Sequence, residues 1–157
     1  MMLRILMTLS LLVAGATPVL AGSEMDPWKA LQRGEFEAAQ AKWLPLAQRG
    51  EVAAQLFLGH MEAMRDHHGE AARWYGLAAA KGDTVAQTLL ATLYLKGRGL
   101  KRDPIKAYAW YDVAAARGHA NAARARDAAG QQMSSNQVET ARKLALDWRS
   151  KGTPEAN

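Results

Sequence analysis

The sequence of 157 residues contains no cysteine, few aromatic residues and no run of five like charges. Without cysteine the chain forms no disulfide, no Cys-x-x-Cys redox centre and no lipid-modified N-terminal cysteine. Packing of the hydrophobic core must therefore stabilise the fold without disulfides. A chain of this length can form such a core as one domain. The formal net charge of +5 is spread along the chain and gives no reason to expect a nucleic-acid partner.

One apolar run of note is present, at the very start. Residues Ile5–Val13 follow the cation Arg4, and Val19-Leu20-Ala21 then offers small residues suited to cleavage. This order predicts a secretory signal peptide, residues 1–21, cleaved after Ala21 or, as an alternative, after Ala16. An uncleaved membrane anchor is disfavoured because the run is shorter than the ~20 residues that span a bilayer. We expect a periplasmic or secreted chain of charge +4 with no membrane span after cleavage.

The main feature of the remaining sequence is a repeat. Cation–glycine pairs recur at intervals of 32, 36 and 34 residues, and an aromatic residue stands seven positions before three of the glycines. Alanine and large apolar residues at three- and four-residue spacing indicate one face of a helix, and a cation followed by glycine indicates its end. The pairs are Arg49-Gly50, Lys81-Gly82, Arg117-Gly118 and Lys151-Gly152, and the aromatic residues are Trp43, Tyr75 and Tyr111.

A second helical pattern follows each glycine. It aligns Ala54-Gln55 with Ala86-Gln87 and places Gly59 opposite Ala91, where a small residue lets another helix approach closely. Asp-Pro pairs and a Ser134–Gln137 capping box predict helix starts. Each unit is therefore two antiparallel helices, and the sequence predicts helices at 26–33, 35–49, 51–65, 68–81, 83–96, 104–117, 119–130 and 135–151.

These motifs give the chain a resemblance to the Sel-one-like repeat family, relatives of the tetratricopeptide repeat. Residues 82–118 match the family pattern nearly throughout, residues 50–82 match in part, and the flanking segments look like divergent caps. In the best unit the matching residues are Ala86, Gln87, Leu90, Tyr94, Gly97, Gly99, Asp103, Lys106, Ala107, Trp110, Tyr111, Ala114, Ala115 and Gly118.

The helical periodicity predicts an all-α fold, and the resemblance implies an α/α superhelix of about four antiparallel hairpins over residues 22–152. We expect a disordered tail at 153–157. The resemblance also implies a role in protein–protein interaction, with a protein or peptide partner. We expect a non-catalytic chain that is monomeric or weakly associated. Two departures are Glu62, where the family has tyrosine, and the missing Gly-x-Gly loop in the unit 50–82. The cysteine-rich branch of the family, some members with reported penicillin-binding or β-lactamase activity, is not matched.

The stretch Asp66-His67-His68-Gly69-Glu70 holds four side chains of the kind that bind metals. Metal ligands must converge on one ion, whereas adjacent residues in a turn point in different directions. We therefore favour a shortened turn in which Asp66 caps the next helix and Glu70 lies in its positive first turn, and we expect no metal site.

Catalytic signatures are absent from the sequence. There is no H-E-x-x-H, G-x-S-x-G, phosphate-binding loop or G-x-G-x-x-G, and "GRGLKRD" follows a predicted helix instead of a strand. We expect no cofactor and no enzyme activity. An envelope enzyme, or enzyme subunit, acting on cell-wall material is the alternative.

The candidate binding residues lie on the first helix of the two best units. By analogy with tetratricopeptide arrays, this helix lines a concave face, and the residues not needed for its core positions point into the groove. The residue types at these positions differ between the two units, as expected where a partner and not the scaffold determines the side chains. The predicted groove residues are Leu56, His60, Ala63, Thr88, Thr92, Leu95 and Lys96.

Overall fold

The computed structural model describes residues 27–154, which form eight α-helices and no β-strand. Every predicted helix is present with ends within one residue of the prediction. The predicted signal peptide, both cleavage sites and Asp26 lie outside the described residues. No helix within the described range is long and apolar enough to cross a bilayer. The helices are α1 (Pro27–Gln32), α2 (Phe36–Gln48), α3 (Val52–Met64), α4 (His68–Ala80), α5 (Thr84–Lys96), α6 (Pro104–Ala116), α7 (Ala120–Gln131) and α8 (Ser135–Lys151).

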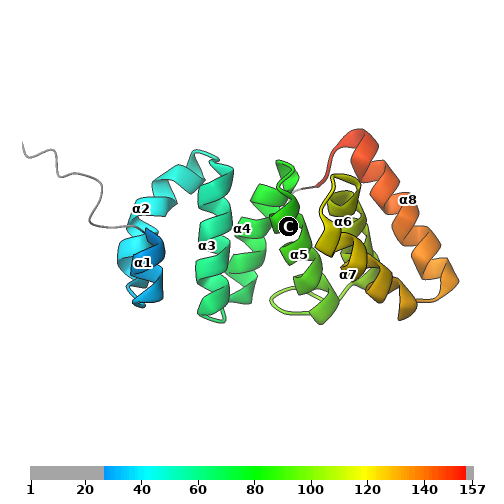
Figure 1. The fold of residues 1–157 in the computed structure, drawn as a ribbon, viewed down its shortest axis with the longest axis horizontal. Helices are drawn as coiled ribbons and strands as arrows, with labels where there is room; N and C mark the ends of the chain where they lie inside the picture. Colours follow the sequence, from blue (N-terminus) through cyan, green and yellow to red (C-terminus); the bar gives the residue numbers. More distant parts are fainter. Residues whose placement is uncertain (1–26, 155–157) are drawn as a thin grey trace, which may run out of the picture.

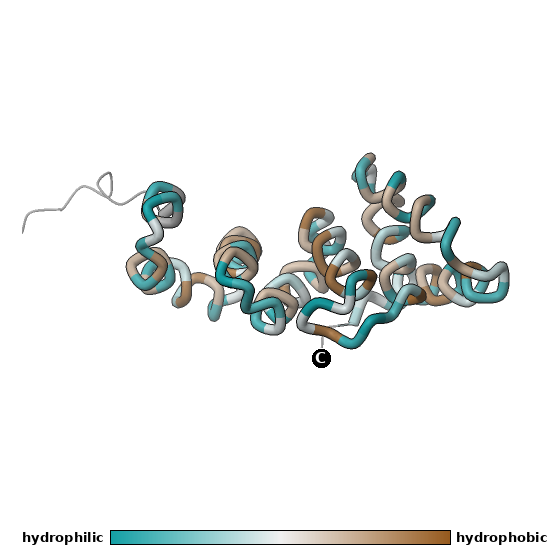
Figure 2. The backbone as a smooth tube through the Cα atoms, turned by 90° about the horizontal axis from the view of Figure 1, so that it is seen from below, coloured by the Kyte–Doolittle hydropathy of each residue, from teal (hydrophilic) through white to brown (hydrophobic). Residues whose placement is uncertain are grey.

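The helices form an elongated row in which each helix from α1 to α7 packs mainly on its neighbours in sequence (Figure 1). The five helices α2 to α6 each have 13 residues, so successive hairpins stack with their ends aligned. Figure 2 views this row from its lower edge, with several helices seen nearly end-on. Stacked hairpins of this kind are an α/α superhelix, which confirms the predicted fold class.

At the C-terminal end of the row, α7 and α8 both pack on α6 and make fewer contacts with each other. The Trp148 and Trp110 rings lie with centroids 4.8 Å apart, and the Arg142 guanidinium donates to the Tyr108 hydroxyl at 3.3 Å. Ala141 and Ala145 are buried on the same face of α8 as Trp148. This apolar stripe of α8 covers α6 at the end of the row.

Glycine ends the second helix of each hairpin because the backbone there is left-handed. Gly82 has φ +92° and Gly118 has φ +89°, values at which a Cβ is strained. The helix starts also match the sequence: Asp103 accepts from the Lys106 amide at 2.9 Å, and Ser134 and Gln137 form the predicted capping box.

The turn between α3 and α4 corrects one prediction. Asp66 does not cap α4; it has φ +58° and follows the C-terminal end of α3, while His67 is the residue before α4. The short turn leaves no room for a glycine-containing loop, so Asp66 itself takes the left-handed conformation that reverses the chain. Glu70 does lie in the first turn of α4, as predicted.

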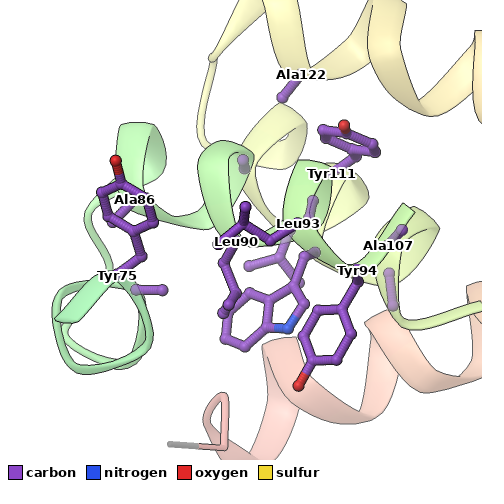
Figure 3. Close-up of a cluster of buried hydrophobic side chains, with 14 of the residues drawn as sticks. Tyr75, Ala86, Leu90, Leu93, Tyr94, Ala107, Tyr111 and Ala122 are labelled. Carbon is purple, nitrogen blue, oxygen red and sulfur yellow. The ribbon is translucent and has the colours of Figure 1, made fainter. Parts of the chain in front are cut away.

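The core is divided into two clusters that share α4. Trp74 belongs to the cluster over α1 to α4, whereas Tyr75 belongs to the cluster over α4 to α8. Figure 3 shows the second cluster, to which Leu90 and Tyr94 from α5 and Ala107 from α6 belong. Each hairpin thus buries one face on the unit before it and the other on the unit after it.

After α8, residues 152–154 turn back along the row (Figure 1). Within the segment 153–157 predicted to be a disordered tail, Thr153 is half-buried and donates to the Ala80 carbonyl at 3.4 Å. Residues 155–157 lie outside the described range.

Candidate protein-binding face

The seven predicted groove residues lie on α3 and α5, and none of them is fully buried. Lys96 is exposed and the other six are half-buried. We call these seven residues the α3–α5 face. Within residues 27–154, no hydrogen bond or ion pair joins its α3 members to its α5 members.

On α3, the polar member of the face is held by the second helix of its own hairpin. The Tyr75 hydroxyl lies 3.2 Å from His60 Nδ1, and the two rings meet edge to face with centroids 5.6 Å apart. Burial lowers the pKa of His60, so the ring is neutral at neutral pH, and burial also raises the pKa of Tyr75. The hydroxyl therefore stays protonated and donates to Nδ1 when the ring proton is on Nε2.

The same pairing occurs in the next hairpin with different chemistry. Thr92 and Tyr111 occupy the positions of His60 and Tyr75, and their hydroxyl oxygens lie 2.8 Å apart. Because the Thr92 hydroxyl donates its only proton to the Thr88 carbonyl at 2.9 Å, the Tyr111 hydroxyl is the donor in this pair. Each hairpin thus orients one polar side chain of the face through a buried tyrosine.

Thr88 is positioned by its own helix. Its hydroxyl donates to the Thr84 carbonyl at 2.7 Å and lies 3.5 Å from His119 Nδ1. His119 Nδ1 already accepts from the Ala122 amide at 3.2 Å as the N-terminal cap of α7. Thr88 therefore has no proton left for His119, and its oxygen remains free to accept from a bound molecule.

A cavity of about 180 Å³ opens beside the α3 members of the face. Leu56 and His60 line it together with Ala53, Phe57 and Trp43. The Trp43 and Phe57 rings stack with centroids 4.8 Å apart, which makes a rigid aromatic wall. The cavity is mostly apolar and contains no charged group at neutral pH, because His60 is neutral there.

The apolar members of the face serve the scaffold in part. Leu56, Ala63 and Leu95 pack against the second core cluster while keeping some exposed surface. Their substitution consequently affects packing as well as any bound partner.

Two sets of contacts between hairpins were not predicted. Gln55 Nε2 donates to the Ala47 carbonyl at 3.1 Å, and Gln87 Nε2 donates to the Ala79 carbonyl at 3.0 Å, both from buried side chains. The alignment of Ala54-Gln55 with Ala86-Gln87 is the signal in the sequence, and it indicates the register of the repeats but not the acceptors of the glutamines.

The cations of the repeated cation–glycine pairs also join hairpins. Lys81 Nζ donates to the Gly50 carbonyl, and Arg117 donates to the Gly82 carbonyl at 3.0 Å. The sequence indicated these cations only as helix-ending residues. In the structure they bind the glycine carbonyl of the preceding unit.

Side chains in and beside the histidine-rich turn pair with the carboxylate of Glu62. His67 Nδ1 lies 2.9 Å from Glu62 Oε2, and Arg65 lies 3.8 Å from the other Glu62 oxygen, so two partners stabilise this buried carboxylate. In residues 27–154, no group of three His, Asp or Glu side chains is arranged to hold a metal ion.

Comparisons with known proteins agree with this geometry. The family model of the Sel1 repeat matches residues 52–83 and 84–119. The chain is similar to the crystal structure of a protective antigen present in uropathogenic Escherichia coli strains that displays an SLR fold, with 30% identity and a TM-score of 0.63. That match covers 86% of this chain and 28% of that one.

A second similar structure is a Sel1 repeat protein from Oxalobacter formigenes, with 24% identity and a TM-score of 0.53 over 78% of this chain and 58% of that chain. This likeness shows the fold. The chain spans less than two thirds of either structure. No curated protein matches the sequence.

Proposed function

We propose that this chain, which is a Sel1-repeat protein, is an exported, non-catalytic scaffold that binds a protein or peptide partner in the bacterial envelope through the α3–α5 face. Sel1-repeat proteins are typically protein-interaction scaffolds. Export is inferred from the signal-peptide pattern of residues 1–21.

The observation that carries the proposal is the contrast between constant and variable positions of the two repeats. The contacts that hold the hairpins together recur with the same residue types, as with Gln55 and Gln87. The α3–α5 face changes at equivalent positions, from Leu56 and His60 to Thr88 and Thr92. Where the scaffold residues stay constant and other positions vary, we infer that contact with a partner determines which side chains stand at the variable positions.

The cavity beside Leu56 and His60 supplies an anchor point. A volume of about 180 Å³ accepts one apolar side chain of a partner, and the stacked Trp43 and Phe57 rings hold it open. A few anchors of this kind dominate the affinity of protein interfaces. A helix or extended segment of the partner fits such a face.

The test combines partner capture with a matched control. Cross-linking in intact cells, followed by mass spectrometry, identifies the captured protein, and its binding is then measured with purified components. The variant Leu56→Glu with Thr92→Glu should lose binding, because it places two charges on a half-buried face that the bound partner would desolvate. The control Leu146→Glu with Thr140→Glu makes the same changes at exposed positions of α8 and should bind normally. Normal binding by the first variant contradicts the proposal.

Export and the absence of activity have separate tests. Mass spectrometry of the chain from the envelope fraction should find an N-terminus at Gly22, and an intact Met1 contradicts cleavage. Purified chain should turn over neither muropeptides nor β-lactams, and turnover would favour the alternative of a cell-wall enzyme.

A further inference from the structure

The loop between α5 and α6 carries a concentration of positive charge that the fold does not neutralise. Residues 96–106 contain five cations and a single carboxylate, Asp103. We call this segment, with the cavity beneath it, the basic loop. In Figure 1 it lies at the lower edge of the row, between α5 and α6. The cations are Lys96, Arg98, Lys101, Arg102 and Lys106, and all five are exposed.

None of these five cations forms an ion pair with any residue in the range 27–154. Elsewhere in that range most arginines have a carboxylate within 4.0 Å, as Arg73 has Glu70 and Arg126 has Asp112. Asp103, which could neutralise the loop, instead accepts from the Lys106 amide at the start of α6. The positive field of the loop is therefore available to another molecule.

Only two of these five cations have a side-chain hydrogen bond or ring contact within the described part of the fold. Arg102 Nε donates to the Leu95 carbonyl at 3.2 Å, and Lys106 Nζ lies 5.4 Å from the centre of the Tyr94 ring. Arg98 and Lys101 make no such contact with the described residues. A cation in the first turn of a helix is also unfavourable, since that end prefers carboxylates. In α4 the first turn carries Glu70, whereas in α6 it carries Lys106.

Close packing of Gly99 against α4 holds the loop in place. A Cβ at Gly99 would lie 2.5 Å from the His68 carbonyl oxygen, so the loop backbone rests directly on the start of α4. Beneath it is a cavity of about 240 Å³ lined by Leu100, Tyr94 and the side chains of Lys101, Arg102, Asp103 and Lys106. A fixed backbone with cations around a small cavity is a preorganised surface for carboxylates.

We propose that the basic loop docks an acidic segment of a protein partner, a short stretch rich in Asp and Glu. The loop provides no exposed aromatic ring for stacking bases, because Tyr94 is only 8% exposed. It also provides no large exposed apolar side chain to insert into a lipid surface: the large apolar side chains exposed in the described residues are Met64, Val85 and Leu146. Lys96 belongs both to this loop and to the α3–α5 face, so one partner can extend across both.

The inference rests on the proposed function only for the protein nature of the partner, and its test is independent of the α3–α5 face. The probe is a fluorescein-labelled peptide of ten glutamates, with a peptide of ten glutamines as its uncharged counterpart, measured by fluorescence anisotropy with the purified full chain. We expect binding of the glutamate peptide alone, weakening as NaCl rises from about 50 to about 300 mM.

The deciding variant is Lys101→Glu with Lys106→Glu, which should weaken binding by about tenfold or more. Its control is Lys42→Glu with Arg124→Glu, which changes the charge equally at two exposed cations without ion pairs in the described residues, and should weaken binding by less than about threefold. Glutamate at position 106 stands three residues after the cap Asp103, a favourable place for it, so the fold should persist. Should its melting temperature fall, Lys101→Gln with Lys106→Gln takes its place.

Equal losses in the two charge-reversal variants would overturn the proposal, because they would show that net charge alone attracts the peptide. Failure of the glutamate peptide to bind, or preferential binding of phosphatidylglycerol vesicles or of a thymidine decanucleotide, would overturn it too. The variant Leu56→Glu with Thr92→Glu should retain peptide binding, so a failed α3–α5 face and a failed basic loop are distinguishable.

Discussion

Gly59 offers a sharp test of how closely the two helices of a hairpin approach. It lies within α3 against the ring of Tyr75, and a Cβ there would lie 2.5 Å from Tyr75 Cδ1 and closer still to Cε1. The ring has little freedom to move, because Tyr75 is 2% exposed and its hydroxyl is paired with His60. The variant Gly59→Ala therefore forces α3 and α4 apart.

Two opposing effects set the magnitude. Overpacking a buried site costs about 1–3 kcal/mol, while alanine in place of glycine within a helix contributes up to about 1 kcal/mol of stability. The control is Gly69→Ala in α4, where the nearest atom to a new Cβ is the Gly99 oxygen at 3.8 Å. This control gains the helix contribution without the clash, so the two variants should differ by about 1–3 kcal/mol.

Urea unfolding followed by circular dichroism measures both variants. For a chain of this size the expected difference corresponds to about 3–12 °C in melting temperature. In the background Tyr75→Leu, which removes the ring, Gly59→Ala should become stabilising, giving a coupling energy of about 1–3 kcal/mol. Equal stabilities of Gly59→Ala and Gly69→Ala would refute the close approach.

Four further predictions concern the scaffold and the α3–α5 face. Gly118→Ala should cost about 1 kcal/mol through its left-handed backbone alone, since no atom lies within 4 Å of a new Cβ; an unchanged melting temperature would contradict this. Ala86→Leu and Ala107→Leu, both at 0% exposure, should each cost about 1–3 kcal/mol by overpacking, and two unchanged melting curves would mean that the register is wrong. Gln87→Leu should cost about 0.5–1.5 kcal/mol because it removes a buried hydrogen bond to the Ala79 carbonyl, which keeps the Gly82 amide as its other donor, and urea unfolding against the exposed change Gln132→Leu can measure this cost. Because the pKa of His60 is lowered in the folded chain, the unfolded chain binds more protons, so stability should fall as the pH drops through about 6.5, and by less in His60→Gln; equal losses in both chains would exclude His60 as the cause.

The sequence was sufficient for the helices because their ends carry strong local signals. Gly82 and Gly118 mark helix ends through a backbone conformation that other residues adopt poorly, and Asp103 and Ser134 mark starts through side-chain caps. The Asp66 prediction was wrong because two local rules competed. Aspartate can cap a helix or adopt a left-handed conformation, and the shortened turn decided in favour of the second.

The contacts between hairpins could not be predicted with the same reasoning. Lys81 reaches a carbonyl 31 positions earlier, and Gln87 reaches one eight positions earlier across a turn, so both depend on how the hairpins stack. The sequence shows that tyrosines recur at the aromatic position of the repeat, yet the use of the buried Tyr75 and Tyr111 hydroxyls by the α3–α5 face required the structure. Whether that face binds a partner stays a prediction.

The bonds from Lys81 to Gly50 and from Arg117 to Gly82 always run toward the N-terminus, so each repeat brings the donor for the unit before it and the acceptor for the unit after it. A tandem duplication of residues 84–119 would therefore be self-consistent at both junctions. The added copy would supply its own arginine to Gly118 and offer its own glycine carbonyl to the next unit, and His119 would cap its first helix as it now caps α7. Insertion of a fraction of a repeat would separate donors from acceptors. The length of such an array can thus evolve in whole repeats without new interfaces having to arise.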